Sequence, residues 1–221
     1  MLRNKKFNGE NNQNITGLCR AIRQSLFLYF CAMKILILDN YDSFTYNLVQ
    51  MTEQITGKRV HVAKNDEISV AQAANFDKII LSPGPGIPSE AGILKELIRD
   101  LHQEIPMLGI CLGLQAIAET FGGSLINLKE IFHGVATPVT ILNTECKLFA
   151  GIPQNFEAGR YHSWAVHPET FPKELEVTAV DGDGIIMALQ HRNLDVHAVQ
   201  FHPESVLTPE GKKIISNFLR S

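Results

Sequence analysis

The chain has 221 residues, of which 45% are hydrophobic, so it can bury a large core and is not expected to be disordered over most of its length. Its net charge of −3 argues against nucleic acid as the main partner. The four cysteines show neither a CxxC pair nor a metal-ligand spacing, which favours reduced thiols, no bound metal and a cytoplasmic protein.

Residues 1–32 differ in composition from the rest of the chain. They carry a net charge of +4, whereas the remainder carries −7, and they are rich in Asn and Gln. Their one apolar run, 26–32, is too short for a bilayer span, which needs about 20 residues. We expect this segment to be a poorly ordered leader, or translation from an upstream start with Met33 as the functional beginning. Residues 33–221 are expected to form one domain that does not enter a membrane.

The next part of the chain alternates strands and helices. Residues 33–39 form a continuous apolar run of the kind that parallel sheets bury. A helix follows, which Asp42 and Ser43 can cap and which Gly57 closes. The same patterns predict further strands over 59–63, 77–82 and 105–110, a helix opened by Ser89 and Glu90, and a helix from 114 that stops at Gly122 and Gly123.

In the last third of the chain, strands follow one another without helices between them. Strands are predicted over 175–180, 185–190 and 196–201, with tight turns between them, and 211–219 reads as a closing helix. The predicted fold class is therefore α/β. It consists of an open, mostly parallel twisted sheet with helices on both faces, flavodoxin-like, plus a small antiparallel section.

The pentapeptide Gly109-Ile110-Cys111-Leu112-Gly113 lies at a predicted strand-to-helix turn. A cysteine with a glycine two residues before and after it is typical of a nucleophile elbow in which sulfur replaces oxygen. The turn is sharp, so small neighbours are needed for the backbone to pass. The following helix directs its N-terminus at the sulfur, which favours thiolate. Cys111 is therefore the predicted nucleophile.

A second motif, His202-Pro203-Glu204, supplies what a cysteine nucleophile lacks. His202 would take the thiol proton and return a proton to the leaving group. Glu204 would hold the imidazole in the right tautomer and stabilise its cation. Residues at i and i+2 of an extended segment point the same way, so both side chains can face the sulfur.

An oxyanion intermediate needs two hydrogen-bond donors. The backbone N–H of Leu112, at the start of the helix, is one candidate, and that of Gly84 is the other because a glycine presents its N–H at close range. Gly84 lies in the loop 83–86, which is not a phosphate loop, since no Gly-Lys-Ser/Thr follows and Pro85 removes a donor.

Each of these motifs, taken alone, is more often a structural turn than a site. All three are nevertheless predicted at the carboxyl ends of strands, where open α/β sheets carry their sites. Their coincidence in one short chain therefore indicates a thiol enzyme.

Several segments resemble known signatures. LSPGPGIP at 81–88, GICLGLQ at 109–115 and FHPES at 201–205 resemble the three signatures of the class I (triad) glutamine amidotransferases. LDNYDSFTYNL at 38–48 resembles a narrower group, the glutamine-hydrolysing subunits of anthranilate synthase and aminodeoxychorismate synthase, and RYHS at 160–163 fits the same group. The resemblance covers all of the chain except the expected leader.

The resemblance implies a reaction without a cofactor. Glutamine binds, Cys111 forms a γ-glutamyl thioester, ammonia leaves and water then releases glutamate. The ammonia would pass to a chorismate-using synthase large subunit, which is expected in trans because the chain ends directly after its last predicted helix. His133 and His162 are expected to be positioning or interface residues. By position, the glutamine-contacting residues are Gly84, Pro85, Gly86, Leu112, Gln115, Ser163 and Trp164.

The chain departs from the family pattern at three positions. Leu114 stands where His is frequent, Trp164 where Leu is common, and Val135 where lysine is frequent. The last departure bears on contact with the partner rather than on hydrolysis.

The favoured function is the ammonia-supplying subunit of anthranilate synthase in tryptophan biosynthesis. The same role in aminodeoxychorismate synthase, for p-aminobenzoate and folate, is the nearest alternative, and the motifs do not separate the two. A stand-alone thiol γ-glutamyl hydrolase is an alternative of another class, which would need no partner. A non-catalytic binding module is disfavoured because it has no use for a nucleophile, a base and an orienting carboxylate.

Overall fold

Five parallel strands carry the half of the fold that the sequence predicts most directly. The computed structural model describes residues 33–220, and the expected leader lies outside the described residues. In sheet order the strands are β2 (His61–Lys64), β1 (Ile35–Asp39), β3 (Lys78–Leu81), β4 (Met107–Ile110) and β11 (Val196–Val199). Because they are parallel, their carboxyl ends meet at one edge of the sheet.

The sheet continues beyond β11 as an antiparallel section. Its strands, in order, are β10 (Ile186–His191), β9 (Leu175–Asp181), β6 (Val135–Ile141) and β7 (Asn155–Arg160). A separate two-stranded sheet pairs β5 (Leu125–Asn127) with β8 (Trp164–Val166). The predicted α/β class is confirmed, but the antiparallel section is larger than the small one expected.

Strand β6 shows why part of this section escapes prediction. Most of its residues are exposed or half-buried, and it contains Pro138, which is rare in strands. Its apolar alternation is therefore weak, and pairing with β7 and β9 holds it in the sheet.

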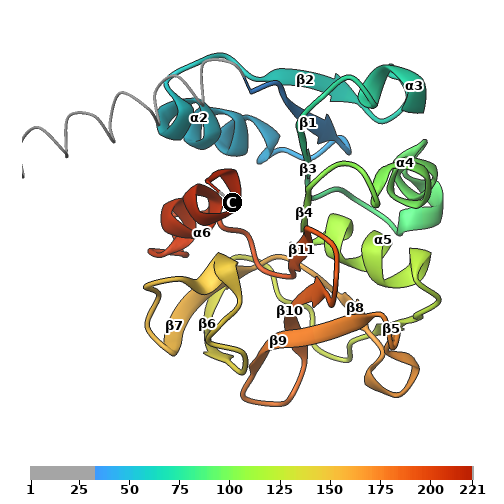
Figure 1. The fold of residues 1–221 in the computed structure, drawn as a ribbon. Helices are drawn as coiled ribbons and strands as arrows, with labels where there is room; N and C mark the ends of the chain where they lie inside the picture. Colours follow the sequence, from blue (N-terminus) through green and yellow to red (C-terminus); the bar gives the residue numbers. More distant parts are fainter. Residues whose placement is uncertain (1–32, 221) are drawn as a thin grey trace, which may run out of the picture.

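Helices cover both faces of the parallel strands (Figure 1). α2 (Thr45–Thr56) and α6 (Gly211–Leu219) lie on one face, and α3 (Val70–Ala73), α4 (Leu94–Leu101) and α5 (Leu112–Thr120) lie on the other. Side chains of β1 alternate between the two layers: Ile35 and Ile37 pack with the α2 and α6 side, and Leu36 and Leu38 with the α4 and α5 side. Short 3-10 helices span Pro88–Glu90, Lys147–Phe149 and Pro168–Thr170.

The start of α2 differs from the prediction. Its N-cap is Phe44, with no side-chain cap, rather than Asp42 or Ser43. The Asp42 carboxylate instead accepts a hydrogen bond from the backbone N–H of Phe44 at 2.7 Å, which stabilises the turn before the helix. Gly57 closes the helix as predicted, in a left-handed conformation with φ 73°.

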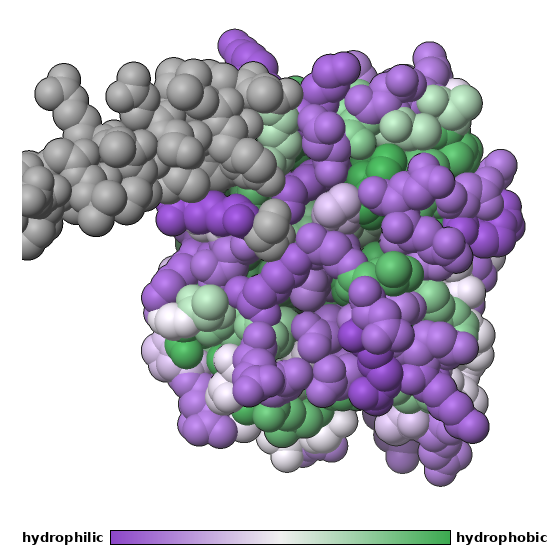
Figure 2. Space-filling model, viewed as in Figure 1, coloured by the Kyte–Doolittle hydropathy of each residue, from purple (hydrophilic) through white to green (hydrophobic). Residues whose placement is uncertain are grey.

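The surface is mainly polar on the face shown in Figure 2, where hydrophobic residues form separate patches among hydrophilic ones. Within residues 33–220, no helix is both long and apolar enough to cross a membrane.

Candidate active site

Cys111 sits in a strained turn between β4 and α5. Its φ of 52° lies in the left-handed region, which non-glycine residues rarely adopt. Its N–H donates to the Val199 carbonyl of β11 at 2.8 Å, and its own carbonyl accepts the first hydrogen bond of α5, from Gln115 at 3.1 Å. The turn therefore fixes the sulfur at the carboxyl end of the sheet, where a nucleophile elbow is expected.

The two glycines that flank Cys111 are required by close packing. A Cβ atom at Gly109 would lie 2.6 Å from the carbonyl carbon of Gly113, and one at Gly113 would lie 2.7 Å from the Leu81 carbonyl oxygen. No side chain fits at either position without moving backbone. The glycine pattern therefore reflects how closely α5 crosses β3 and β4.

His202 and Glu204 form a buried pair beside Cys111. Nδ1 of His202 lies 2.7 Å from Oε1 of Glu204, and since an ionised carboxylate can only accept, this contact places a hydrogen on Nδ1. Two backbone contacts hold His202 itself: its N–H donates to the Gly159 carbonyl, and its carbonyl accepts from the Thr208 hydroxyl at 2.7 Å.

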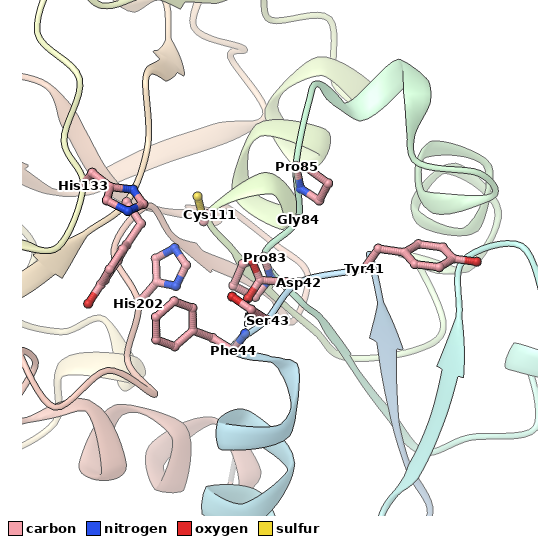
Figure 3. Close-up of a pocket in the computed structure, with 11 residues that line it drawn as sticks. Tyr41, Asp42, Ser43, Phe44, Pro83, Gly84, Pro85, Cys111, His133 and His202 are labelled. Carbon is pink, nitrogen blue, oxygen red and sulfur yellow. Dashed lines mark hydrogen bonds between the residues drawn. The ribbon is translucent and has the colours of Figure 1, made fainter.

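The second ring nitrogen of His202, Nε2, is directed toward Cys111 (Figure 3). It is buried, and no hydrogen bond to another described side chain satisfies it. Burial alone would lower the pKa of His202, but the Cys111 sulfur and the Glu204 carboxylate outweigh burial and raise this pKa to about 10. The site therefore favours an imidazolium at neutral pH.

Two aromatic rings hold the imidazole in place. The ring of Tyr161 lies 4.8 Å from that of His202, and the ring of Phe44 lies 5.7 Å away in an edge-on arrangement. The two aromatic rings also contact each other at 5.0 Å. The Tyr161 hydroxyl hydrogen-bonds to Ser205, so this side chain is anchored at its far end as well.

Cys111 lies where two cavities meet. An outer cavity of about 340 Å³ is bounded by the loop from Tyr41 to Phe44 and by His133 and His202 (Figure 3). An inner cavity has a volume of about 150 Å³. Both cavities are lined by Gly84, Pro85, Cys111 and Tyr161, and the inner one also by Gly86, Gln115, His162, Ser163 and Trp164.

The structure thus brings together the side chains and loops that the sequence singled out. Every residue of the predicted glutamine-binding set except Leu112 lines the inner cavity. Leu112 is the first residue of α5, so its N–H has no partner within the helix. Gly84 packs closely on this turn, since a Cβ there would lie 2.7 Å from a Leu112 methyl group and 2.6 Å from the Asn40 carbonyl oxygen.

Gln115 lines the inner cavity, but its amide nitrogen is already hydrogen-bonded within the protein. Its amide nitrogen donates to the Trp164 carbonyl at 3.0 Å and lies 3.5 Å from the amide oxygen of Gln200. Gln200 in turn directs its own amide nitrogen at the Cys111 sulfur, 3.5 Å away. Sequence reasoning missed Gln200. Its position two residues before His202 could have identified it, because residues at i and i+2 of an extended segment point the same way.

His162 is neutral and serves to connect buried groups. Burial, and then the charge of Arg160, lower its pKa to about 4. Nε of Arg160 donates to Nε2 of His162 at 3.1 Å, so the hydrogen of the neutral ring is on Nδ1, which donates to the Trp164 carbonyl at 2.9 Å. Arg160 also pairs with Asp181 at 2.6 Å and lies over the Phe132 ring. This arrangement fits the expected positioning role.

Asp42 is a further acidic group beside the pair. One oxygen each of Asp42 and Glu204 and one ring nitrogen of His202 lie within 4.8 Å of one another, a spacing compatible with a metal ion. The 2.7 Å bond between His202 and Glu204 already accounts for two of the three groups. The cluster is therefore explained by the pair itself. Burial raises the pKa of Asp42, the largest effect on this carboxyl.

Comparison with known proteins places this geometry in context. The family described as glutamine amidotransferase class-I matches residues 36–221. The chain is 43% identical over 195 residues to anthranilate synthase component 2 of Pseudomonas putida, covering 85% of this chain and 97% of that protein. It is 42% identical over 187 residues to aminodeoxychorismate synthase component 2 of Klebsiella aerogenes, covering 84% and 98%.

Some relatives are longer than this chain. The chain is 45% identical over 192 residues to anthranilate synthase beta subunit 1 of rice, covering 84% of this chain and 66% of that protein. It spans 32% of a bifunctional protein TrpGD from Thermotoga maritima. A solved structure from Thermoplasma acidophilum, assigned to a GMP synthase, has a TM-score of 0.75 and 27% identity, covering 85% of this chain and 92% of that one.

Proposed function

Because this chain belongs to the class I glutamine amidotransferase family, we propose that it hydrolyses L-glutamine to glutamate and delivers ammonia to a chorismate-aminating synthase subunit in the cytoplasm. The single observation that carries this proposal is the convergence of a thiol, an imidazole and a carboxylate: the His202–Glu204 pair lies beside Cys111, and Cys111 lines both the outer and the inner cavity. Cys111, His202 and Glu204 are the proposed catalytic residues.

In the first half of the reaction, the Cys111 thiolate attacks the side-chain amide carbon of glutamine and a sulfur–carbon bond forms. The Nε2–H of the His202 imidazolium gives its proton to the amide nitrogen, the carbon–nitrogen bond breaks, and ammonia leaves a γ-glutamyl thioester. The raised pKa of His202, about 10, supports this role because it keeps the imidazole protonated and ready to donate.

In the second half, water attacks the thioester carbon while Nε2 of His202 accepts a proton from that water. The sulfur–carbon bond breaks, glutamate leaves, and the thiolate and imidazolium are restored. Glu204 stabilises the cation and fixes the ring through its 2.7 Å contact with Nδ1. We assign the oxyanion to the backbone N–H groups of Leu112 and Gly84, each worth about 3–4 kcal/mol of barrier.

The inner cavity is the proposed glutamine site. Its lining combines the elbow with the 84–86 loop and with Gln115, Ser163 and Trp164, and its volume suits one small molecule. Trp164 offers its backbone carbonyl to Gln115 and His162, so the departure from leucine at this position leaves that contact intact.

The proposed partner is the large subunit of anthranilate synthase. Relatives named anthranilate synthase component 2 include those of Pseudomonas putida and of Pseudomonas aeruginosa, each 43% identical. A large subunit of aminodeoxychorismate synthase is the second candidate, since a protein named component 2 of that synthase is 42% identical.

The test measures glutamate release by the purified chain alone and with each large subunit plus chorismate. We expect slow hydrolysis alone and faster hydrolysis with one large subunit, together with glutamine-dependent formation of anthranilate or aminodeoxychorismate. Fast hydrolysis that responds to neither subunit would indicate a stand-alone γ-glutamyl hydrolase.

A matched pair of cysteine variants tests the nucleophile. Cys111→Ser is expected to abolish hydrolysis and labelling by a diazo-ketone analogue of glutamine. Cys146→Ser, which changes a buried cysteine outside both cavities, is expected to leave both unchanged. Full activity of Cys111→Ser would contradict the assignment.

A further inference from the structure

Among the described residues, the side chain of Gln200 lies within hydrogen-bond distance of the sulfur of Cys111. Gln200 follows the last residue of β11 and is fully buried, with 0% of its surface exposed. Its amide nitrogen lies 3.5 Å from Sγ of Cys111, within hydrogen-bond range for sulfur. The sequence motifs do not assign any function to this residue.

The direction of the Gln200 amide is fixed by its surroundings. Its oxygen faces the amide nitrogen of Gln115 at 3.5 Å, and that nitrogen also donates to the Trp164 carbonyl at 3.0 Å. Turning the Gln200 amide over would set two NH₂ groups against each other and an oxygen against the sulfur. The network therefore requires the nitrogen of Gln200 to face Cys111.

The backbone of Gln200 is held as firmly as its side chain. Its N–H donates to the Met187 carbonyl of β10 at 2.8 Å, and the adjacent Val199 carbonyl accepts from the N–H of Cys111. The donor and the sulfur thus come from two neighbouring strands that are bonded directly to each other. The amide needs no rearrangement to meet the sulfur.

We propose that Gln200 is a catalytic hydrogen-bond donor that stabilises the thiolate form of Cys111. This inference rests on the proposed function, because it concerns the nucleophile of the same reaction. A hydrogen bond to an anionic acceptor is about twice as strong as one to a neutral acceptor, so the amide favours thiolate over thiol. The same preference aids the second half of the reaction, in which the neutral thioester sulfur becomes thiolate again.

Other titratable groups surround the two cavities at this sulfur. His202, with Glu204 behind it, faces the sulfur from the segment after β11, and Tyr161 and His162 face it from the segment between β7 and β8. Tyr41 and Asp42 lie on the loop after β1, and His133 lies on the segment before β6. Gln200 differs from all of these because its amide does not titrate, so it stays a hydrogen-bond donor at every pH.

The experiment measures how fast iodoacetamide, a small neutral reagent, alkylates Cys111 as a function of pH. Peptide mass spectrometry assigns the product to Cys111 and separates it from products at the other three cysteines. The variants are Gln200→Met, which has a similar length but no donor, and Gln200→Glu, which keeps an oxygen for Gln115 but sets an anion beside the sulfur. Gln190→Met is the control, since Gln190 bonds Glu176 in β9 and lines neither cavity.

The alkylation rate rises with pH, and the inflection at the lowest pH marks where the thiolate of Cys111 forms. We expect Gln200→Met to move this inflection up by about one pH unit, and so to slow alkylation about tenfold at pH values below it. Gln200→Glu should move it further in the same direction, and Gln190→Met should not move it. Circular dichroism and thermal unfolding establish that each variant is folded. If Gln200→Met does not fold, the shift of the inflection in Gln200→Glu alone tests the proposal.

A folded Gln200 variant whose profile coincides with that of the unmodified protein would overturn this inference alone. Failure of the proposed function has a different signature. In that case Cys111 of the unmodified protein would not react at neutral pH, or glutamine would not protect it from alkylation.

Discussion

At the scale of single residues, the site is built from paired groups whose charges depend on each other. The imidazole of His202 is buried, which opposes its charge, yet two neighbours keep it charged: the sulfur of Cys111 and the carboxylate of Glu204. Burial also lowers the pKa of His162, but its neighbour Arg160 is a cation and lowers this pKa further, so His162 stays neutral. Two histidines of similar burial therefore differ in charge because their neighbours differ in sign.

Glu204→Gln removes the anion that supports the imidazolium. We expect kcat to fall by about 10²–10⁴ with little change in KM, because the variant loses a contact to the acid–base residue rather than to substrate. The pKa of His202 should also fall toward its ordinary value, so the alkaline limb of the kcat profile should move to lower pH. Steady-state kinetics between neutral pH and pH 10 measure both effects.

The control for this variant is Glu169→Gln, at an exposed glutamate outside the site. It should leave the whole pH profile unchanged. An alkaline limb that stays in place in Glu204→Gln would mean that Glu204 does not support the charge of His202.

His162 should make the stability of the fold depend on pH. Its pKa in the folded protein, about 4, is lower than the ordinary value of 6.5, so the unfolded chain binds the proton more tightly. Its contribution is therefore complete above pH 6.5 and is lost as the pH falls from 6.5 toward 4. Between pH 7 and pH 5 the loss is about 2 kcal/mol.

His162→Gln isolates this effect, since glutamine can accept from Arg160 and donate to the Trp164 carbonyl without titrating. Urea unfolding at pH 7 and pH 5 should show a smaller drop in stability for the variant than for the unmodified protein. Equal drops in the two proteins would show that His162 is not buried in its neutral form.

At the scale of helices and strands, the site depends on how closely elements cross. The first turn of α5 passes over β3 and β4 at a distance that admits no Cβ at Gly109 or Gly113. Helix α6 begins just as tightly, because a Cβ at Gly211 would lie 1.8 Å from the carbonyl oxygen of Pro203. The segment that carries His202 is thus held between β7 on one side and the start of α6 on the other.

Gly109→Ala tests the packing beneath the nucleophile. Its Cβ would meet the Gly113 carbonyl carbon at 2.6 Å and the Ile117 side chain at 2.8 Å, and the backbone cannot yield as a flexible side chain would. We expect a loss of about 1–3 kcal/mol of stability. Activity should also fall at temperatures where the variant is folded, because α5 and the elbow must shift. Chemical unfolding and glutamate release measure the two effects.

Gly182→Ala is the matched control, since nothing lies within 4 Å of a Cβ at that turn. It should change neither stability nor activity. If Gly109→Ala behaved in the same way, the close crossing of α5 over the sheet would not determine the position of Cys111.

At the scale of the whole molecule, one continuous sheet carries most of the site, and Trp164 joins it from β8 of the separate two-stranded sheet. The loops after β1, β3 and β4 and the segment after β11 meet at the carboxyl edge of its parallel half, and β7 reaches the same place from the antiparallel half. A single cooperative unit over residues 33–221 is therefore the domain organisation that we propose.

A chain that starts at Met33 tests this organisation. We expect it to unfold at the same temperature and in the same single transition as the full-length chain, because every strand and helix of the described sheet and helical layers lies within residues 33–220. Differential scanning calorimetry of the two chains gives the comparison, and glutamate release checks the site. A marked loss of stability in the shorter chain would show that the leader is part of the fold.

The sequence by itself determined the parts of this protein that depend on local patterns. The alternation of apolar strands and amphipathic helices predicted the α/β class, which is confirmed, and the match to the glutamine amidotransferase class-I family confirms the resemblance. Glycine spacing predicted the turn at Cys111. The two-residue spacing of His202 and Glu204 predicted that their side chains could meet, and they lie 2.7 Å apart. Their catalytic roles stay predictions.

Only the tertiary structure decided what surrounds those residues. Gln200 faces the sulfur because β4 and β11 pair in register, with Val199 opposite Ile110, and no local pattern encodes that register. Phe44, Tyr161 and Asp42 approach His202 from the loop after β1 and the segment after β7, and no local pattern encodes these contacts either. Periodicity reports which face of an element is apolar, whereas contacts between elements far apart in the chain depend on how the whole sheet is assembled.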